Sequence, residues 1–376
     1  MIKPDVLVFG DLCPDNDYRQ LFDNSPDGAF APEVVAMMRK SALVIGNLEC
    51  PATAQRKPLT KCGPNLRAKP QDIKKLKSCG FGVLSLANNH ILDFCTQGVE
   101  DTLVNCRDAG IVTVGAGKDA TVARRPAVVD VAGKRVGIAS FAEAEFNLAT
   151  ETSPGANHFD PYSSFDDVRA LSAQADYVIV LYHGGIEHYK YPSPLLQKKC
   201  RKFAECGADL VLCQHSHCIG TLEQFGNGTI LYGQGNSLFG YRTGNSVWNE
   251  GLVAAVELDS QKITFKLLQA RENGIAFATP EEAADRLERM RKDSEILNDT
   301  ALLKEKWRDF CQSQASLDLP LLYGWGHIAN KLNRMLGNCL FAWRYSKRKQ
   351  MTTMNLLRCE AHHEVVQTIL ESRVFK

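Results

Sequence analysis

The stretch GVLSLANNHILDF, residues 82–94, joins an apolar run to side chains that bind metals and carry protons. Its run 83–86 is short, apolar and unbroken, which is typical of a strand buried on both faces of a parallel sheet. Asn89 and His90 follow directly, and Asp93 comes three residues later. Loops that follow such strands are where open α/β sheets present ligands. The stretch therefore predicts an α/β fold with a polar site at a strand end.

The same arrangement recurs after four further apolar runs: Asp11 after 6–9, Glu49 after 43–45, His183 after 178–182, and His215 and His217 after 210–212. Because alternate residues of an extended strand end face one side, His215 and His217 are expected to point the same way. Taken singly, each residue is explained as readily by a turn, a helix cap or a buried imidazole. Together they predict one shared site whose carboxylate, amide and imidazole ligands suit Mn²⁺, Fe²⁺ or Zn²⁺.

Further apolar runs at 111–114, 136–141, 230–232 and 252–258 alternate with amphipathic stretches such as 97–109 and 194–206. This alternation predicts an α/β fold with helices on both faces of the sheet. The pairs 126–141 and 252–268 resemble antiparallel hairpins, which favours a mixed sheet or two packed sheets. Beyond about residue 272 only helical patterns follow, at 281–297, 300–316 and 355–373. We therefore expect one domain over residues 1–271 and a helical C-terminal extension over 272–376.

Composition narrows the class of protein. The 376 residues are 44% hydrophobic and 23% charged, as in an ordinary globular chain, which excludes a disordered tail, a collagen-like chain or a coiled-coil rod. The net charge of +1 implies no overall attraction to nucleic acid. Thirteen cysteines, an odd number, without a Cys-x-x-Cys pair, a secretion signal or a membrane-spanning run predict reduced thiols and a cytoplasmic protein. The oligomeric state stays open.

A basic segment lies near the C-terminus. The 41 residues between Asp318 and Glu360 hold seven Lys or Arg and no acid, together with Trp325 and Trp343. One interpretation is peripheral contact of residues 324–349 with an anionic membrane, or binding of a polyanionic polymer. The others are a packed helix with a solvated charged face and apolar tryptophan anchors, or a basic entrance to the metal site that selects an anionic substrate.

Six segments resemble the CapA family of capsule-synthesis proteins, a branch of the calcineurin-like metallophosphoesterase superfamily: GDLCPD (10–15), GNLECP (46–51), SLANNHILDF (85–94), HGGIEH (183–188), GADLVLCQHSH (207–217) and LYGQGNSLF (231–239). They occur in the family's order and cover most of residues 5–270. The resemblance implies a four-layer α/β/β/α metallophosphoesterase-like sandwich, here with a helical C-terminal appendage. It also implies a divalent metal centre, with two ions, at the strand ends.

The resemblance also implies roles for individual residues. The first metal would be held by Asp11 and His217 and the second by Asn89, His183 and His215, with Glu49 bridging the two. His90 matches the histidine that sits beside the substrate, and Asp93 the acid that orients it. The residues expected at the substrate are Glu187, His188 and Asn236, of which Asn236 is expected to line the pocket.

Cys13 departs from the superfamily pattern, which usually has a histidine two residues after the first aspartate. The superfamily also usually has Asp where Glu49 stands, although the CapA branch resembles this chain there. Cys13 is therefore either a thiolate ligand or a packed neighbour, and a buried free cysteine is more often the latter. In that case the first metal site would lack one ligand.

Two classes of function remain. The first is a metal-dependent hydrolase of a phosphoester or related anionic linkage, acting on a small molecule or a polymer in capsule or surface-polymer biosynthesis. Poly-γ-glutamate, the polymer after which the family is named, would present a γ-glutamyl amide instead. In either case His90, oriented by Asp93, would protonate the leaving group. The second is a non-catalytic factor that binds the polymer or assists its assembly.

Overall fold

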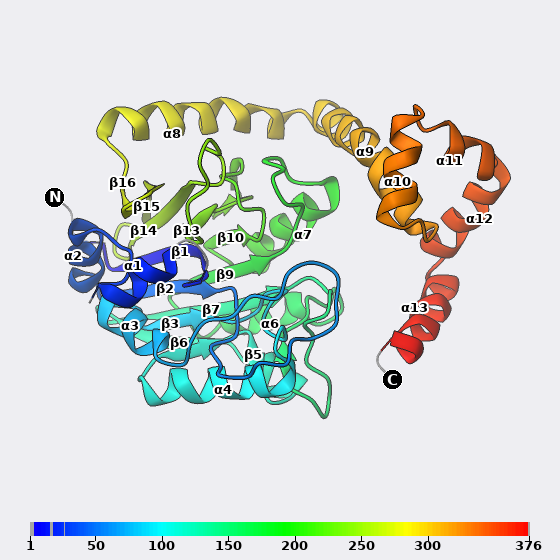
Figure 1. Cartoon of the computed structure of the whole chain (residues 1–376). Coiled ribbons are helices and arrows are strands. Elements are labelled where there is room, and N and C mark those ends of the chain that lie inside the picture. The colour runs from blue at the N-terminus through cyan, green and yellow to red at the C-terminus, as the bar shows by residue number, and fades with distance from the viewer. Residues whose placement is uncertain (1–3, 16–17, 26, 375–376) are drawn as a thin grey trace. The chain divides into compact units, whose positions relative to one another are not determined.

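The computed structural model describes residues 4–15, 18–25 and 27–374. It comprises two compact units, Met1–Leu303 and Lys304–Lys376. The strands all belong to the first unit, where they form two facing sheets with helices outside them (Figure 1). Residues 272–303 also belong to this unit, so the boundary lies further along the chain than the expected 271/272.

The first sheet has eight strands, in the order β16-β15-β14-β1-β2-β3-β4 with β13 paired to β1. Their bounds are β1 (Val6–Leu12), β2 (Leu43–Leu48), β3 (Val83–Ser85), β4 (Val112–Val114), β13 (Asn236–Leu238), β14 (Glu250–Glu257), β15 (Lys262–Arg271) and β16 (Gly274–Phe277). Strands β1 to β4 are parallel, so their carboxyl ends share one edge of the sheet. The predicted hairpin over 252–268 is confirmed as the antiparallel pair β14 and β15.

The second sheet has six strands, in the order β11-β12-β10-β9-β7-β6. Their bounds are β6 (Ala127–Val131), β7 (Lys134–Ala142), β9 (Tyr177–His183), β10 (Leu210–Gln214), β11 (Leu222–Phe225) and β12 (Gly228–Leu231), and a separate short pair is β5 (Ala116–Gly117) and β8 (Gly155–Ala156). The hairpin over 126–141 is confirmed as β6 and β7, and β9 runs parallel to both β7 and β10. All nine predicted apolar runs contain strands, whereas the short strands β5, β8, β11, β13 and β16 were not predicted.

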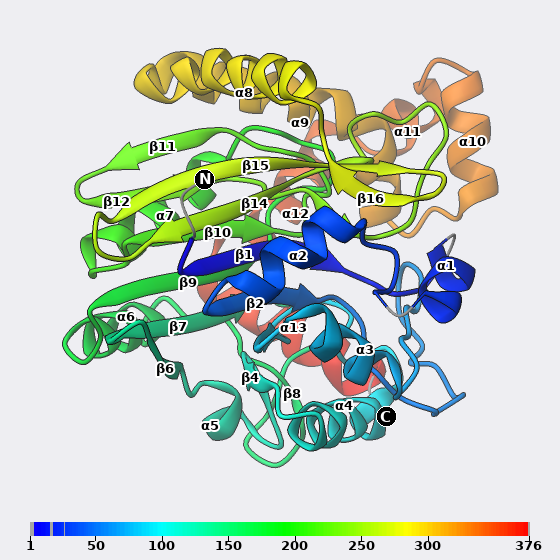
Figure 2. The same cartoon turned by 90° about the vertical axis from the view of Figure 1, so that its left-hand side faces the viewer.

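Helices α2, α3 and α4 cover the outer face of the first sheet and α6 and α7 that of the second, while α8 packs against the core between the sheets (Figure 2). The helices of this unit are α1 (Arg19–Asn24), α2 (Pro32–Lys40), α3 (Asp72–Cys79), α4 (Cys95–Asp108), α5 (Ala120–Ala123), α6 (Ser164–Ser172), α7 (Pro194–Glu205), α8 (Pro280–Ser294) and the 3-10 helix η2 (Glu295–Asn298). The helix α8 begins at Thr279, whose side chain and that of Glu282 cap each other's backbone N–H groups.

Three apolar cores separate four layers. Along β1, Leu7 and Phe9 face the core beneath α2, α3 and α4, while Val6 and Val8 face the core between the two sheets. A third core lies between the second sheet and helices α6 and α7, around Phe203. The expected four-layer α/β/β/α sandwich is therefore confirmed.

The second unit is helical, and its first helix begins at Thr300, within the first unit. Its helices are α9 (Thr300–Leu322), α10 (His327–Met335), α11 (Cys339–Arg344), α12 (Lys347–Arg358) and α13 (Glu360–Val374). The single helix expected over 355–373 is instead two helices, because Cys359 has extended backbone with a ψ of 117°.

Two further findings concern the chain as a whole. No helix among the described residues is both long enough and apolar enough to cross a bilayer. The thirteen cysteines are all free thiols.

Candidate metal centre

The carboxyl ends of strands from both sheets converge on one buried polar cluster. The first sheet contributes Asp11 from β1 and Glu49 from the end of β2. The second contributes His183 from the end of β9. The backbone N–H of His215 donates a 3.0 Å hydrogen bond to Oδ2 of Asp11, which joins the two sheets at this point. The site therefore forms only where the two sheets meet.

Two groups of possible ligands share Glu49. One comprises Asp11, Glu49 and His217, and the other Glu49, His183 and His215; within each group the ligand atoms lie within 4.8 Å of one another. The sixth candidate, Asn89, places its Oδ1 2.9 Å from Nε2 of His183. The structure thus brings together all six residues named as metal ligands, in the division that the resemblance implies.

The polar atoms of this cluster fit a bound cation. Both carboxylate oxygens of Glu49 are fully buried and accept no hydrogen bond from the described part of the chain, and Nδ1 of His215 is likewise without a partner there. Burying an unpaired charge or polar atom is costly. Two carboxylates, three imidazoles and one amide oxygen form a donor set for a borderline divalent ion such as Mn²⁺, Fe²⁺ or Zn²⁺.

Burial shifts the protonation equilibria of these residues away from their charged forms. Burial, followed by the nearby Glu49, raises the pKa of Asp11 to about 7. Burial also raises the pKa of Glu49 to about 8 and lowers the pKa of His183 to about 4. A divalent cation would bind the carboxylate and neutral imidazole forms, so metal binding and proton release are coupled here.

The two histidines that follow β10 do not lie as the sequence predicts. The strand ends at Gln214, and His215 and His217 have positive φ angles of 89° and 49°. An extended strand end would place both rings on one side, but this turned backbone sends each ring to a different ligand group. Non-glycine residues rarely adopt such angles, which occur at functional sites that the surrounding fold holds in place.

The buried Cys13 thiol packs in the core beneath α2 to α4, and it does not belong to either group of ligands. Burial, and then the neighbouring Cys13, raise the pKa of the Cys50 thiol. The structure thus favours a packed neighbour over a ligand at Cys13. The first group therefore offers three side chains, which leaves a position for water or substrate.

His90 and Asp93 form a pair beside the cluster. Nδ1 of His90 lies 2.6 Å from Oδ2 of Asp93, which also accepts a 2.6 Å hydrogen bond from the backbone N–H of Leu66. A hydrogen on Nδ1 leaves Nε2 as the nitrogen available to a substrate. The sequence did not single out Lys61, whose Nζ lies 2.5 Å from Oδ1 of Asp93 and 3.2 Å from Nδ1 of His90.

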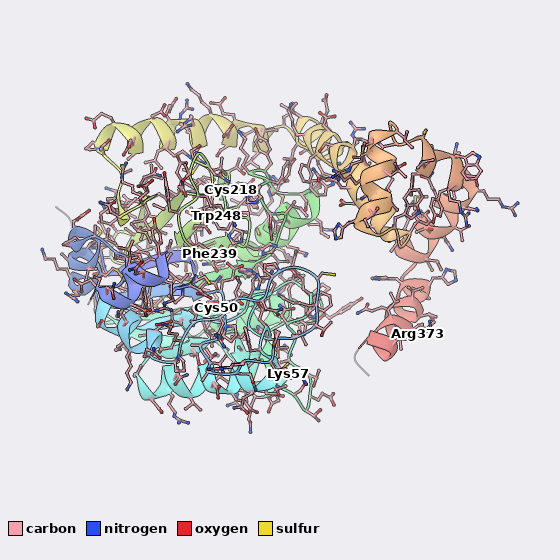
Figure 3. The ribbon with its side chains drawn as sticks, viewed as in Figure 1. Cys50, Lys57, Cys218, Phe239, Trp248 and Arg373 are labelled. Atoms are coloured by element: carbon pink, nitrogen blue, oxygen red, sulfur yellow. The ribbon has the colours of Figure 1, made fainter. Side chains whose placement is uncertain are left out.

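A cavity of about 460 Å³ opens beside this pair. Asn89 and His217 belong both to its wall and to the polar cluster, and His90 and the predicted substrate residues Glu187 and His188 also line it. The lining residues that the sequence did not indicate include Lys61, Glu145, Phe239, Arg242 and Trp248. Phe239 and Trp248, both labelled in Figure 3, pack at ring-centroid distances of 4.7 and 4.9 Å from the His217 ring.

Asn236 has a different place from the one expected. Its Oδ1 lies 2.8 Å from Nδ1 of His217, and its Nδ2 donates a 2.9 Å hydrogen bond to the carbonyl of Trp248. The contact orients the His217 imidazole with Nε2 toward Glu49, 3.9 Å from Oε1. Asn236 is therefore a positioning residue for a candidate ligand instead of a pocket-lining residue.

The length of the irregular segment that carries Lys61 is the one feature that could have drawn attention to this residue. It lies on residues 53–67, a long segment with little regular structure that ends close to the cavity; Figure 3 labels Lys57 on the same segment. Connections of this length inside a compact domain are often functional. By contrast, Arg242 and Trp248 follow the last matching motif and have no local pattern that distinguishes them.

Comparison with known proteins places this site in a family. The model of the family "Bacterial capsule synthesis protein PGA_cap" matches residues 5–241, more than half of the chain. A capsule biosynthesis protein, CapA, of Bacillus anthracis is 28% identical over 246 residues, which cover 63% of this chain and 60% of the relative. A probable polyglutamine synthesis accessory protein of Mycobacterium tuberculosis is 31% identical over 229 residues, covering 56% and 59%. The chain thus matches about three fifths of the length of these relatives.

Solved structures give weaker similarities. A hypothetical protein from Thermus thermophilus has a TM-score of 0.46 at 14% identity, covering 70% of this chain and 98% of that one. A 5'-nucleotidase precursor from the same organism has a TM-score of 0.36 at 17% identity, covering 73% and 50%. At these values neither similarity bears on function. The family match over residues 5–241 does, and it shows that the chain belongs to the bacterial capsule synthesis (PGA_cap) family.

Proposed function

We propose that this protein is a divalent-metal-dependent hydrolase that cleaves an anionic linkage, a phosphoester or a related bond, during the synthesis or processing of a capsule or surface polymer. The observation that carries the proposal is the buried Glu49 carboxylate, which is shared by two groups of ligands and has no hydrogen-bond partner in the described chain. Two ions would be held by Asp11, Glu49 and His217 and by Glu49, Asn89, His183 and His215. When bound, such ions lower the pKa of water and stabilise negative charge on the reacting group.

The protein's own residues would bind the substrate and transfer the proton. Arg242 lines the cavity and would supply positive charge for an anionic group, whereas the ammonium of Lys61, also in the wall, is already paired with Asp93. Asp93 holds the His90 ring through Nδ1, so Nε2 of a protonated His90 can donate a proton to the leaving oxygen or nitrogen. Trp248 and Phe239 pack against His217 and limit the access of water from that side.

The test measures metal content and turnover in the same preparations. We expect about two equivalents of Mn, Fe or Zn per chain, and metal-dependent cleavage of bis(p-nitrophenyl) phosphate or of γ-glutamyl p-nitroanilide; which probe is cleaved distinguishes a phosphoester from an amide. His183→Ala and His217→Ala should abolish this turnover, while His158→Ala, outside the cluster, should not. Unchanged rates in both site variants would refute the proposal.

A second candidate is a non-catalytic factor that binds the polymer or assists its assembly. The mycobacterial relative is named an accessory protein, and the first ligand group lacks a fourth side chain because Cys13 is packed in the core. Against it stands the His90–Asp93 pair at the cavity, since a purely structural ion needs no proton donor beside it. Full metal occupancy without cleavage of any anionic probe would favour this candidate.

A further inference from the structure

Helix α10 turns its apolar side outward. Ile328, Leu332 and Met335, spaced four and three residues apart, share one face of the helix and are 88%, 50% and 75% exposed. The other side carries Asn330 and Asn333, which are 5% and 0% exposed. An amphipathic helix on the surface of a globular protein normally has the opposite arrangement.

Hydrogen bonds fix this orientation of α10. Nδ2 of Asn330 donates to the Leu317 carbonyl at 3.3 Å. Oδ1 of Asn333 accepts a 2.9 Å hydrogen bond from the backbone N–H of Phe341, and its Nδ2 donates to Asn338 at 3.0 Å. Rotating the helix to hide its apolar side would leave these buried amides and their partners unpaired, which is costly.

The interior of this unit is already filled by other side chains. Phe341 and Tyr345 pack with centroids 4.9 Å apart, and Tyr323 lies 4.1 Å from Tyr345. Trp325 donates a 3.2 Å hydrogen bond from Nε1 to the Tyr345 hydroxyl, so this tryptophan is an anchor of the unit. Trp343, in contrast, is 84% exposed. The apolar side of α10 therefore takes no part in this core.

The charge of the segment has one sign. Residues 319–359 hold seven Lys or Arg and no acid. Lys331 and Arg334 lie on α10 itself and are exposed, and the run 347–349 at the start of α12 is exposed too. A partner that complements both the exposed apolar side of α10 and the positive charge of this segment has an apolar interior covered by negatively charged groups. The interface of an anionic membrane has this structure.

We propose that the α10 face, defined by Ile328, Leu332 and Met335, lies in the plane of an anionic lipid membrane, with exposed Lys and Arg side chains of the same basic segment at the lipid phosphates. The exposed Trp343 would sit at headgroup level, where aromatic rings with a polar edge are enriched. This inference is independent of the proposed hydrolase activity.

The test is sedimentation of the full chain with vesicles of 30% phosphatidylglycerol in phosphatidylcholine, and with vesicles of phosphatidylcholine alone. We expect binding to the anionic vesicles that weakens with salt, and at least about tenfold weaker binding to the neutral ones. The variant Ile328→Gln/Leu332→Gln/Met335→Gln should lose at least about tenfold in affinity, and Lys347→Gln/Arg348→Gln/Lys349→Gln about 100-fold. The matched control replaces three exposed apolar residues of the first unit: Val104→Gln/Val128→Gln/Leu195→Gln.

Several outcomes would overturn the proposal. These are absence of binding by the wild type, equal binding to both kinds of vesicle, and equal losses in the α10 variant and the control. Light scattering on the same samples covers the remaining alternative: a wild-type dimer that the α10 variant converts to a monomer would make this face an interface between two copies of the chain. Circular dichroism and metal content check that the variants are folded.

Discussion

Metal uptake by this site should release protons, and the number released should fall as the pH rises. The native pKa values are about 7 for Asp11 and about 8 for Glu49. At pH 7 Asp11 is then half protonated and Glu49 about nine-tenths protonated, while burial keeps His183, with a pKa of about 4, neutral. Filling the site at pH 7 should therefore displace at least about one proton, and clearly fewer at pH 8.5.

The assay is isothermal titration with Mn²⁺ in pairs of buffers that differ in ionisation enthalpy, at pH 7.0, 7.5, 8.0 and 8.5. The observed heat then varies with the buffer in proportion to the protons released. The apparent affinity for Mn²⁺ should also rise about tenfold between pH 7 and 8, because on average about one proton is displaced over that interval.

The direction of the trend distinguishes this explanation from its main competitor. A metal-bound water that loses its own proton would release more protons at higher pH, not fewer. Proton release that grows with pH, or that is absent at pH 7, would therefore refute the assignment of these two buried carboxyls as ligands that are protonated in the metal-free protein.

Glu49→Gln is the matched control, since the amide keeps the shape of the side chain but does not titrate. The raised pKa of Glu49 means that the metal-free native state retains a proton that the unfolded chain releases above about pH 4.5. Stability of the metal-free protein is therefore lost as the pH rises through about 8. Between pH 6.5 and 8 the free energy of unfolding should fall by about 1.5 kcal/mol more in the wild type than in Glu49→Gln, because the other titrating groups are shared by both proteins.

Three further substitutions test the surroundings of the site. Lys61→Met removes the cation beside Asp93 and should reduce turnover of the phosphodiester probe about tenfold with metal content unchanged; a parallel loss of metal would contradict a role in the cavity. Gly184→Ala should weaken Mn²⁺ binding at least about tenfold, because its Cβ would lie 2.6 Å from the Glu143 carboxylate and displace the adjacent His183; titration with Mn²⁺ that gives the wild-type affinity would show that the turn tolerates the methyl group. Phe203→Ala empties the core between α7 and the second sheet and should cost about 3–5 kcal/mol in urea unfolding without changing metal stoichiometry; a cost below about 1 kcal/mol would contradict the packing.

Nine strands of the sandwich could be predicted because each of them contains an apolar run long enough to be recognised on its own. The burial of all seven residues of β1 and all six of β2 explains why their sequences lack the polar alternation of half-exposed strands. The short strands escaped prediction for the opposite reason: β13, Asn236–Leu238, is held by pairing with β1 and has no apolar run of its own.

The domain boundary was harder to predict because α8 has the sequence of an exposed, charged helix. Only three of its side chains, Ala283, Leu287 and Met290, reach the core between the sheets. Their spacing of four and three residues is the pattern of a narrow apolar stripe. Such a stripe is present in the sequence, but nothing local tells which surface it covers, so the helix looked like part of the C-terminal extension.

Site residues could be predicted where a side chain that binds metals directly follows an apolar strand. They could not be predicted where a residue has its role only through contacts with distant parts of the chain. Asp11 and His183 belong to strands of different sheets, yet Asn47 donates to Oδ1 of Asp11 at 2.8 Å and lies 3.1 Å from Nδ1 of His183. Asn47 therefore holds an acid of one sheet against an imidazole of the other, a role that nothing in the segment GNLECP indicates. The same is true of Asn236, whose contact with His217 depends on the pairing of β13 with β1.

The position of Glu49 explains why the two sheets must be considered together. Its carboxylate is wholly buried where the sheets meet, with the His183 imidazole 3.4 Å and the His217 imidazole 3.9 Å from Oε1. Burial favours the neutral forms of both imidazoles, so neither supplies a positive charge to compensate the carboxylate. An amide or an apolar residue at this position would destabilise the fold less than Glu49 does, since burying an acid without a compensating partner is unfavourable. A cation shared by the two ligand groups would compensate a carboxylate in this place, and the Glu49→Gln control measures that coupling directly.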